Sequence, residues 1–127
     1  MSHSENHYAT QETDLLAVII EGVREKKGKK IAHLDLSELE NIPCKHFIIC
    51  TAGSSPQVKA IATEIEKQTW EHLEEGPMRK EGVQHQEWII LDYFNIVVHI
   101  FLQEKRDFYK LEELWSDAKI THYEDLL

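Results

Sequence analysis

The sequence predicts a single α/β domain with five strands and flanking helices. Three observations support this fold class. The run 46–51 reads HFIICT and is almost continuously apolar, as in a strand buried on both faces of a sheet. The segment 54–76 has the caps and the apolar spacing of an amphipathic helix. Two further apolar runs, 87–93 and 96–102, are separated by two residues, which is typical of a hairpin.

Length and composition fit one globular domain. The chain has 127 residues, and its hydrophobic and charged fractions of 42% and 29% are ordinary for a soluble protein. No apolar run reaches the roughly 20 residues of a membrane helix. The first residues carry Glu5, Glu12 and Asp14 and lack a signal segment, so we expect a cytoplasmic protein. The formal net charge of −9 disfavours broad binding to phosphate backbones and favours a basic protein partner.

The first half of the chain is predicted as tail, helix, strand and strand. Residues 1–11 are expected to be a flexible tail. Apolar side chains at helical spacing predict a helix over 12–27, and Gly28 is placed to stop it. A strand over 30–36 follows, and then the central strand 46–51.

The second helix is defined by its ends. Ser54 or Ser55 can cap its N-terminus, and Pro56 suits the first turn because its missing N–H has no helical partner there. Gly76-Pro77 ends the helix. One stripe of this helix is expected to face the core: Val58, Ile61, Ala62, Ile65 and Thr69.

The hairpin allows its cross-strand pairs to be counted. A short strand over 78–81 precedes it, and its turn is placed at Phe94-Asn95. Counting outward from this turn sorts the side chains onto two faces. One face is wholly apolar and is expected to be core: Ile89, Leu91, Tyr93, Ile96, Val98 and Ile100. The other is mixed and is expected to be covered by a helix or by a partner: Trp88, Ile90, Asp92, Val97, His99 and Phe101.

The remaining segments complete the organisation of the chain. One or two short helices are expected over 103–115 and a C-terminal tail over 119–127, so that the domain spans 12–118. Cys44 and Cys50 would lie about 20 Å apart along an extended chain. A disulfide needs Cα atoms within roughly 7 Å, so both cysteines are predicted to be free thiols.

A catalytic alternative rests on Gly53-Ser54, which lie between a strand and a helix, as in the glycine-serine turn of nucleotidyltransferases. Those enzymes need two carboxylates about two residues apart soon after this turn, to hold their catalytic metals. No carboxylate follows here until Glu64. We therefore expect a protein that is not an enzyme and needs no cofactor. A nucleotide-binding or nucleotidyltransferase-type enzyme is the alternative hypothesis.

Two side chains of the mixed hairpin face are candidates for recognition. The apolar face already supplies the core, so Trp88 is a candidate anchor, since binding energy in interfaces concentrates in Trp, Tyr and Arg. The alternative is that Trp88 is itself a core residue. His99 is either a hydrogen-bonded histidine of the sheet or a binding residue. None of the eight histidines has metal-ligand spacing in an ordered segment, so no metal site is predicted.

Four segments match one protein family in order and spacing. They are FIICTAGSSPQVKAIA (47–62), Glu81-Gly82, WIILDYFNIVVHIF (88–101) and FYKLEELWSDA (108–118). On these segments the chain resembles the ribosome silencing factor family, also called the RsfS or Iojap family, over about residues 15–118.

The resemblance implies both a fold and a function. The fold is a mixed sheet flanked by helices, like that of nucleotidyltransferases but without their activity. The function is that of a translational repressor, which binds the large ribosomal subunit through ribosomal protein fourteen and sterically blocks joining of the small subunit. Trp88 corresponds to a tryptophan of the family's contact surface. Leu91, Asp92 and Tyr93 match the same motif, and His99 matches it without an assigned role.

Two further expectations follow. With a net charge of −9, docking on a ribosomal protein is favoured and little direct nucleic-acid contact is expected. A homodimer that pairs through the hairpin face is an alternative use of the same surface. The family usually has Gly-Asp in the turn where this chain has Phe94-Asn95. Phe at a position that needs positive φ is strained, so a longer or shifted turn is an alternative to the counted register.

Overall fold

The computed structural model describes residues 3–42 and 44–126, and the side chains of residues 12–42, 44–106, 110 and 113–126. The elements follow one another in this order: α1 (His3–Glu25), β1 (Lys29–Asp35), β2 (His46–Ala52), α2 (Ser55–Leu73), β3 (Arg79–Glu81), β4 (Trp88–Asp92), β5 (Ile96–Leu102), α3 (Gln103–Tyr109), α4 (Leu111–Leu114) and β6 (Lys119–His122).

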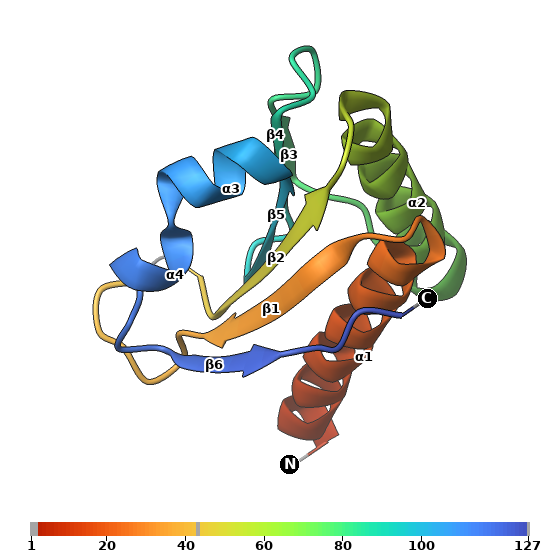
Figure 1. Ribbon diagram of the computed structural model, residues 1–127. Coiled ribbons are helices and arrows are strands. Elements are labelled where there is room, and N and C mark those ends of the chain that lie inside the picture. The colour runs from red at the N-terminus through yellow and green to blue at the C-terminus, as the bar shows by residue number, and fades with distance from the viewer. Residues whose placement is uncertain (1–2, 43, 127) are drawn as a thin grey trace.

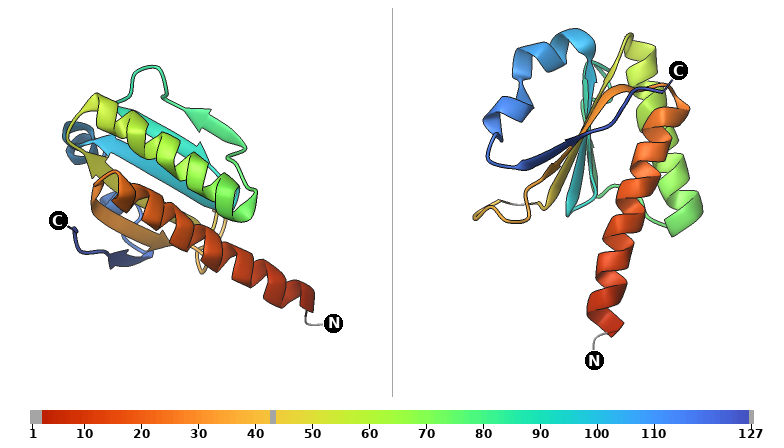
Figure 2. Two further views of the ribbon diagram at one scale, coloured as in Figure 1. Left: turned by 90° about the vertical axis from the view of Figure 1, so that its right-hand side faces the viewer. Right: turned by 60° about the horizontal axis from the view of Figure 1, so that its bottom comes forward.

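The strands form one mixed sheet in the order β3-β4-β5-β2-β1-β6. β2 and β5 are parallel, and every other neighbouring pair is antiparallel. Helices α1 and α2 cover one face of the sheet, and α3 and α4 lie on the other face (Figures 1 and 2). The predicted mixed α/β sheet flanked by helices is confirmed.

Within the described residues the sheet has six strands, where the sequence predicted five. β6 pairs antiparallel with β1, from Ala32↔His122 to Asp35↔Lys119. Three of its four side chains are exposed, so its sequence, KITH, has no apolar alternation that would distinguish it from a tail. The segment 119–122 is thus a strand of the sheet and not the start of a C-terminal tail.

Helix α1 also begins earlier than expected. It starts at His3 and not near residue 12, so the expected N-terminal tail is helical from His3 onward. The letters of residues 3–11, HSENHYATQ, contain no apolar stripe at helical spacing, which is why the sequence pattern did not reveal these turns. At its other end α1 stops as predicted near Gly28, whose N–H donates to the Val23 carbonyl at 2.9 Å, while Lys27 takes the left-handed conformation.

The first hydrophobic cluster lies between the sheet and the two long helices. It contains the complete apolar face predicted for the hairpin, and all five residues of the predicted α2 stripe are buried. Gly22 on α1 permits the close approach of the two helices, because a Cβ there would lie 3.0 Å from the Cα of Ile65. Ser54 is the N-cap of α2 and accepts a hydrogen bond from the Gln57 N–H.

The hairpin keeps the counted register. Its pairs include Trp88↔Phe101, Leu91↔Val98 and Asp92↔Val97, so the alternative of a shifted turn is wrong. The turn is short and strained at Phe94, whose φ is 78°. It is closed by a hydrogen bond of 3.1 Å from the Asn95 N–H to the Tyr93 carbonyl, as in a γ-turn.

Neighbouring groups hold this turn in place. The Asp92 carboxylate accepts the Phe94 N–H at 2.8 Å. The Asn95 carbonyl accepts the N–H groups of Lys45 and His46 at 2.8 and 2.9 Å. The turn is therefore tied both to β4 and to the chain entering β2.

Phe94→Gly is expected to stabilise the protein by about 1 kcal/mol. Glycine has no Cβ, so it removes the strain of positive φ, and the Phe94 ring is 62% exposed and contributes little burial. Urea unfolding measures the change. Phe94→Ala is the matched control, because it removes the ring but keeps the Cβ and should give no such gain. Equal stability of the two variants would contradict the strain.

Candidate functional site

The mixed face of the hairpin is divided into a covered part and an open part. Phe101 is buried in a second hydrophobic cluster together with Leu34 and Ile49. Trp88 is half-buried at the edge of this cluster and stacks on Phe101 with ring centroids 4.9 Å apart. The Phe101 end of this face is therefore covered by the chain itself, and cover of the open part by a partner stays a prediction.

His99 is the most constrained polar residue of this face. Its Nδ1 accepts a hydrogen bond of 3.1 Å from the indole Nε1–H of Trp88. Because an indole nitrogen can only donate, this bond places the proton of the neutral imidazole on Nε2. The ring also meets the edge of Phe47 with centroids 4.8 Å apart. Trp88 and Phe47 thus fix both the orientation and the tautomer of His99.

The Nε2 atom of His99 is buried and has no hydrogen-bond partner among the described residues. Burial lowers the pKa of His99 to about 4, so the ring is neutral at physiological pH. A buried N–H without an acceptor costs about 1–3 kcal/mol. Such a group in a stable protein is a candidate for contact with a ligand that supplies the acceptor.

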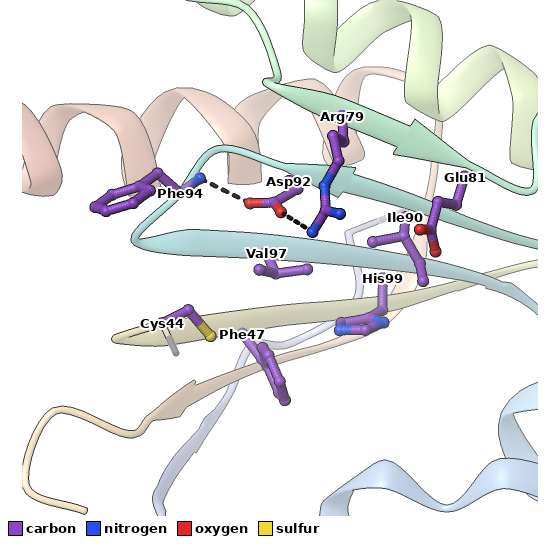
Figure 3. Close-up of a pocket in the computed structure, with 9 residues that line it drawn as sticks. All are labelled: Cys44, Phe47, Arg79, Glu81, Ile90, Asp92, Phe94, Val97 and His99. Carbon is purple, nitrogen blue, oxygen red and sulfur yellow. Dashed lines mark hydrogen bonds and ion pairs between the residues drawn. The ribbon is translucent and has the colours of Figure 1, made fainter. Parts of the chain in front are cut away.

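A cavity of about 260 Å³ opens beside His99 (Figure 3). β2, β3, β4 and β5 and the residues next to them line it: Cys44, Phe47, Arg79, Glu81, Ile90, Asp92, Phe94, Val97 and His99. Phe47, Ile90 and Val97 contribute apolar side chains. Asp92 forms an ion pair of 3.3 Å with Arg79 and contributes the charged part of the wall. The arrangement combines apolar surface, one unpartnered N–H and an oriented carboxylate.

Gly82 determines how β3 meets β4 beside this cavity. Its φ is 79°, and a Cβ there would collide with the Trp88 carbonyl oxygen. Only glycine fits this close approach. The Glu81-Gly82 pair therefore has a structural role, since it brings Arg79 and Glu81 to the cavity.

The predicted site residues fall on two sides of the sheet. Asp92 and His99 line the cavity, and Trp88 supports His99. Leu91 is fully buried on the opposite face, and the Tyr93 hydroxyl lies 2.9 Å from the Thr69 Oγ1 of α2. Leu91 and Tyr93 therefore fasten β4 to the helices and do not reach the cavity.

The sequence missed several lining residues. Ile90 and Val97 were assigned to the mixed face but not to the site, although the counted pairs place them next to Asp92 and His99. Phe47 lies on β2, whose parallel register with β5 cannot be counted across the long connection between them. Arg79 and Glu81 belong to a strand of three residues with no apolar pattern.

Other predicted features can be placed as well. Cys44 and Cys50 are free thiols, as predicted. Among the residues that the structure describes, no group of three His, Cys, Asp or Glu side chains is arranged to hold a metal ion. Within the same residues, no helix has the length and apolarity to cross a membrane.

Comparison with known proteins decides the family. A family model described as "Ribosomal silencing factor during starvation" matches residues 9–126. The chain belongs to the RsfS family. The ribosomal silencing factor RsfS of Halalkalibacterium halodurans is 33% identical over 114 residues, which cover 90% of this chain and 96% of that protein. The chloroplastic protein Iojap of Arabidopsis thaliana is 34% identical over 74 residues, which cover 58% and 30%.

The fold is shared with solved structures. A crystal structure of a protein from Chromobacterium violaceum superposes with a TM-score of 0.76 at 33% sequence identity, and the match covers 82% of this chain and 85% of that one. The resemblance to the RsfS family found in the sequence is thus confirmed.

Acidification is expected to destabilise this RsfS family member through His99. Burial lowers its folded-state pKa from 6.5 to about 4, so between these values the unfolded chain binds a proton that the folded protein does not. The contribution of His99 to the free energy of unfolding is fully present above pH 6.5. It falls by about 3 kcal/mol as the pH approaches 4. Urea unfolding at a series of pH values measures the loss.

His99→Gln is the matched variant, because glutamine can accept the Trp88 N–H but does not titrate. Its stability should lose this part of the pH dependence. The pKa of His33 is also lowered by burial, and it contributes equally to both proteins. The same acid loss in the variant and in the unaltered protein would refute the role given to His99.

Proposed function

We propose that this protein represses translation by binding ribosomal protein fourteen of the large subunit and sterically blocking the joining of the small subunit. Membership of the family of ribosomal silencing factors supports this proposal. The contact surface is chosen because the cavity is lined by apolar side chains and by His99, whose buried Nε2–H has no partner among the described residues.

The size and polarity of the cavity favour a protein side chain as its occupant. Its volume of about 260 Å³ lies below the roughly 300–1,000 Å³ of typical small-molecule sites. An apolar side chain of the partner would cover Ile90 and Val97, and a nearby carbonyl or hydroxyl oxygen would accept the Nε2–H of His99. The ion pair between Asp92 and Arg79 would then orient a polar rim, as in other protein interfaces.

Five residues match the family motif of the hairpin, and they would contribute to binding in different ways: Trp88, Leu91, Asp92, Tyr93 and His99. Asp92 and His99 would touch it directly. Trp88 would act through its hydrogen bond to His99. Leu91 and Tyr93 would act only by holding β4 on the helical layer, since their side chains face α2 and the first cluster.

Steric blocking needs no chemical step, and we infer that the protein works without catalysis or a cofactor on a nucleotidyltransferase-like fold. The net charge of −9 favours a basic ribosomal protein as the partner. We place the protein in the cytoplasm, since its proposed partner is the ribosome. A homodimer through the same hairpin face would compete with ribosome binding.

Ile90→Glu is expected to reduce co-sedimentation with large subunits by more than about tenfold, because it places a charge among the apolar side chains of the cavity. Gradient sedimentation with separated subunits measures the loss. Thr63→Glu is the matched control, since it adds the same charge at an exposed position of α2 on the other side of the sheet. If folded Ile90→Glu binds as well as Thr63→Glu, the cavity is not the contact surface.

Trp88→Phe is expected to weaken binding to large subunits by about fivefold, the equivalent of one hydrogen bond of about 1 kcal/mol. The variant keeps the stack on Phe101 but removes the indole N–H, so the Nε2–H of His99 is no longer fixed. Trp115→Phe removes an indole from the same cluster without touching that bond and serves as the control. Equal affinities of the two variants would leave Trp88 a purely structural role.

A further inference from the structure

A second cavity, of about 460 Å³, lies at the opposite end of β2 from the first. Its lining includes three lysines and one acid: Lys27, Lys29, Lys30, Thr51, Ala52, Gly53, Gln57, Gln103 and Asp125. Residue 47 at the start of β2 belongs to the first cavity and residues 51–52 at its end to the second, so the two cavities are separated by the length of this strand.

Positive charge is concentrated in the segment 24–30, of which Lys27, Lys29 and Lys30 line this cavity. Of the 14 lysines and arginines of the chain, five lie within the segment 24–30, next to a single acid: Arg24, Lys26, Lys27, Lys29 and Lys30. The whole chain has a net charge of −9, which conceals this local excess. Lys27 and Lys30 line the cavity and are exposed, so their ammonium groups are available to an external anion.

The backbone of the basic segment is held in a fixed shape. The Gln57 amide donates to the carbonyls of Lys26 and Lys27, both at 3.1 Å. Its oxygen accepts the Gly53 N–H at 2.8 Å. Because both ends of this amide bond within the chain, the lysines are the groups that would bind a ligand. Arg106, which is buried, donates to the Lys30 carbonyl. The lysines are thus presented by a clamped turn, which lowers the entropy lost on binding.

One of the residues that line the cavity is a carboxylate, Asp125. The Asp125 Oδ1 accepts the backbone N–H of Lys30 at 2.7 Å. The Lys29 ammonium donates to the Leu126 carbonyl at 2.8 Å, and Arg24 to the Glu124 carbonyl at 3.3 Å. The segment 124–126 is exposed and runs beside the turn between α1 and β1 (Figure 1). The Lys30 N–H beside the cavity therefore binds a carboxylate oxygen in the structure, and the residue that supplies this oxygen lies on an exposed segment.

We propose that this basic cavity binds the phosphate backbone of ribosomal RNA, and that residues 124–126 form a cover whose Asp125 carboxylate occupies the place of a phosphate oxygen. Lysine ammonium groups and backbone N–H groups are the usual donors to nucleic-acid phosphates. RNA is favoured over other polyanions because the proposed function places the protein on a ribosome, and the inference rests on that function. Phosphate contact at this cavity differs from the expectation of little nucleic-acid contact that was drawn from the net charge.

The test measures binding of the full chain to a defined RNA hairpin by fluorescence anisotropy at several salt concentrations. The double variant Lys27→Gln/Lys30→Gln should bind at least about tenfold more weakly, with a salt slope reduced by roughly two ion equivalents. Lys67→Gln/Lys119→Gln is the matched control, since both lysines are exposed and the change in net charge is the same. Equal loss in the two double variants would overturn the proposal.

Asp125→Asn tests the cover, because it removes the competing charge. It should bind the hairpin more tightly than the unaltered protein by several fold, and weaker binding would overturn the role of residues 124–126. Vesicles of phosphatidylserine and phosphatidylcholine test the other polyanionic surface. Binding of vesicles without binding of RNA would overturn the assignment to RNA.

Different variants test the protein contact at the first cavity and the RNA contact at the second. Ile90→Glu should leave binding to the RNA hairpin unchanged, and Lys27→Gln/Lys30→Gln should leave binding to isolated ribosomal protein fourteen unchanged. If Ile90→Glu does not weaken subunit binding, the result contradicts the proposed function alone. If Lys27→Gln/Lys30→Gln does not weaken RNA binding, the result contradicts the proposal for the second cavity alone.

Discussion

The parallel pairing of β2 with β5 joins two strands that are about fifty residues apart in the chain, along residue pairs from His46↔Ile96 to Ala52↔Leu102. Alternating side chains of β2 enter both hydrophobic clusters, with Ile48 and Cys50 on the side of the long helices and Ile49 on the other. The rest of the architecture depends on this pairing, because the connection between the two strands contains α2, β3 and β4. The same pairing brings Phe47 against His99 and so completes the wall of the first cavity.

Local patterns predicted most of the fold, and contacts between distant segments account for the rest. The caps of α2, its buried stripe and the two faces of the hairpin follow from spacing rules that act over a few residues. β6 was missed because an exposed edge strand of four residues, paired only with β1, has no pattern of its own. The early turns of α1 were missed for the same reason, since the residues 3–11 lack an apolar stripe.

The candidate site was predictable only in part. Counting pairs from Phe94-Asn95 placed Asp92 and His99 on one face, and the structure keeps that register in spite of the strained turn. The family motif alone joined Leu91 and Tyr93 to them, although strand alternation directs these two side chains to the other face. The basic cavity could not be predicted, because Asp125 and Lys30 meet only through the pairing of β6 with β1.

The two edges of the sheet restrict the kinds of assembly that this chain can form. The β3 edge is three residues long, reads Arg-Lys-Glu and is exposed throughout. The β6 edge is four residues long and begins with a lysine. Short, charged edge strands are poor templates for an added strand from another molecule. A partner, including a second copy of the chain, is therefore directed away from strand addition and toward docking by side chains. This geometry keeps recognition separate from the backbone hydrogen bonding that drives aggregation of open sheets.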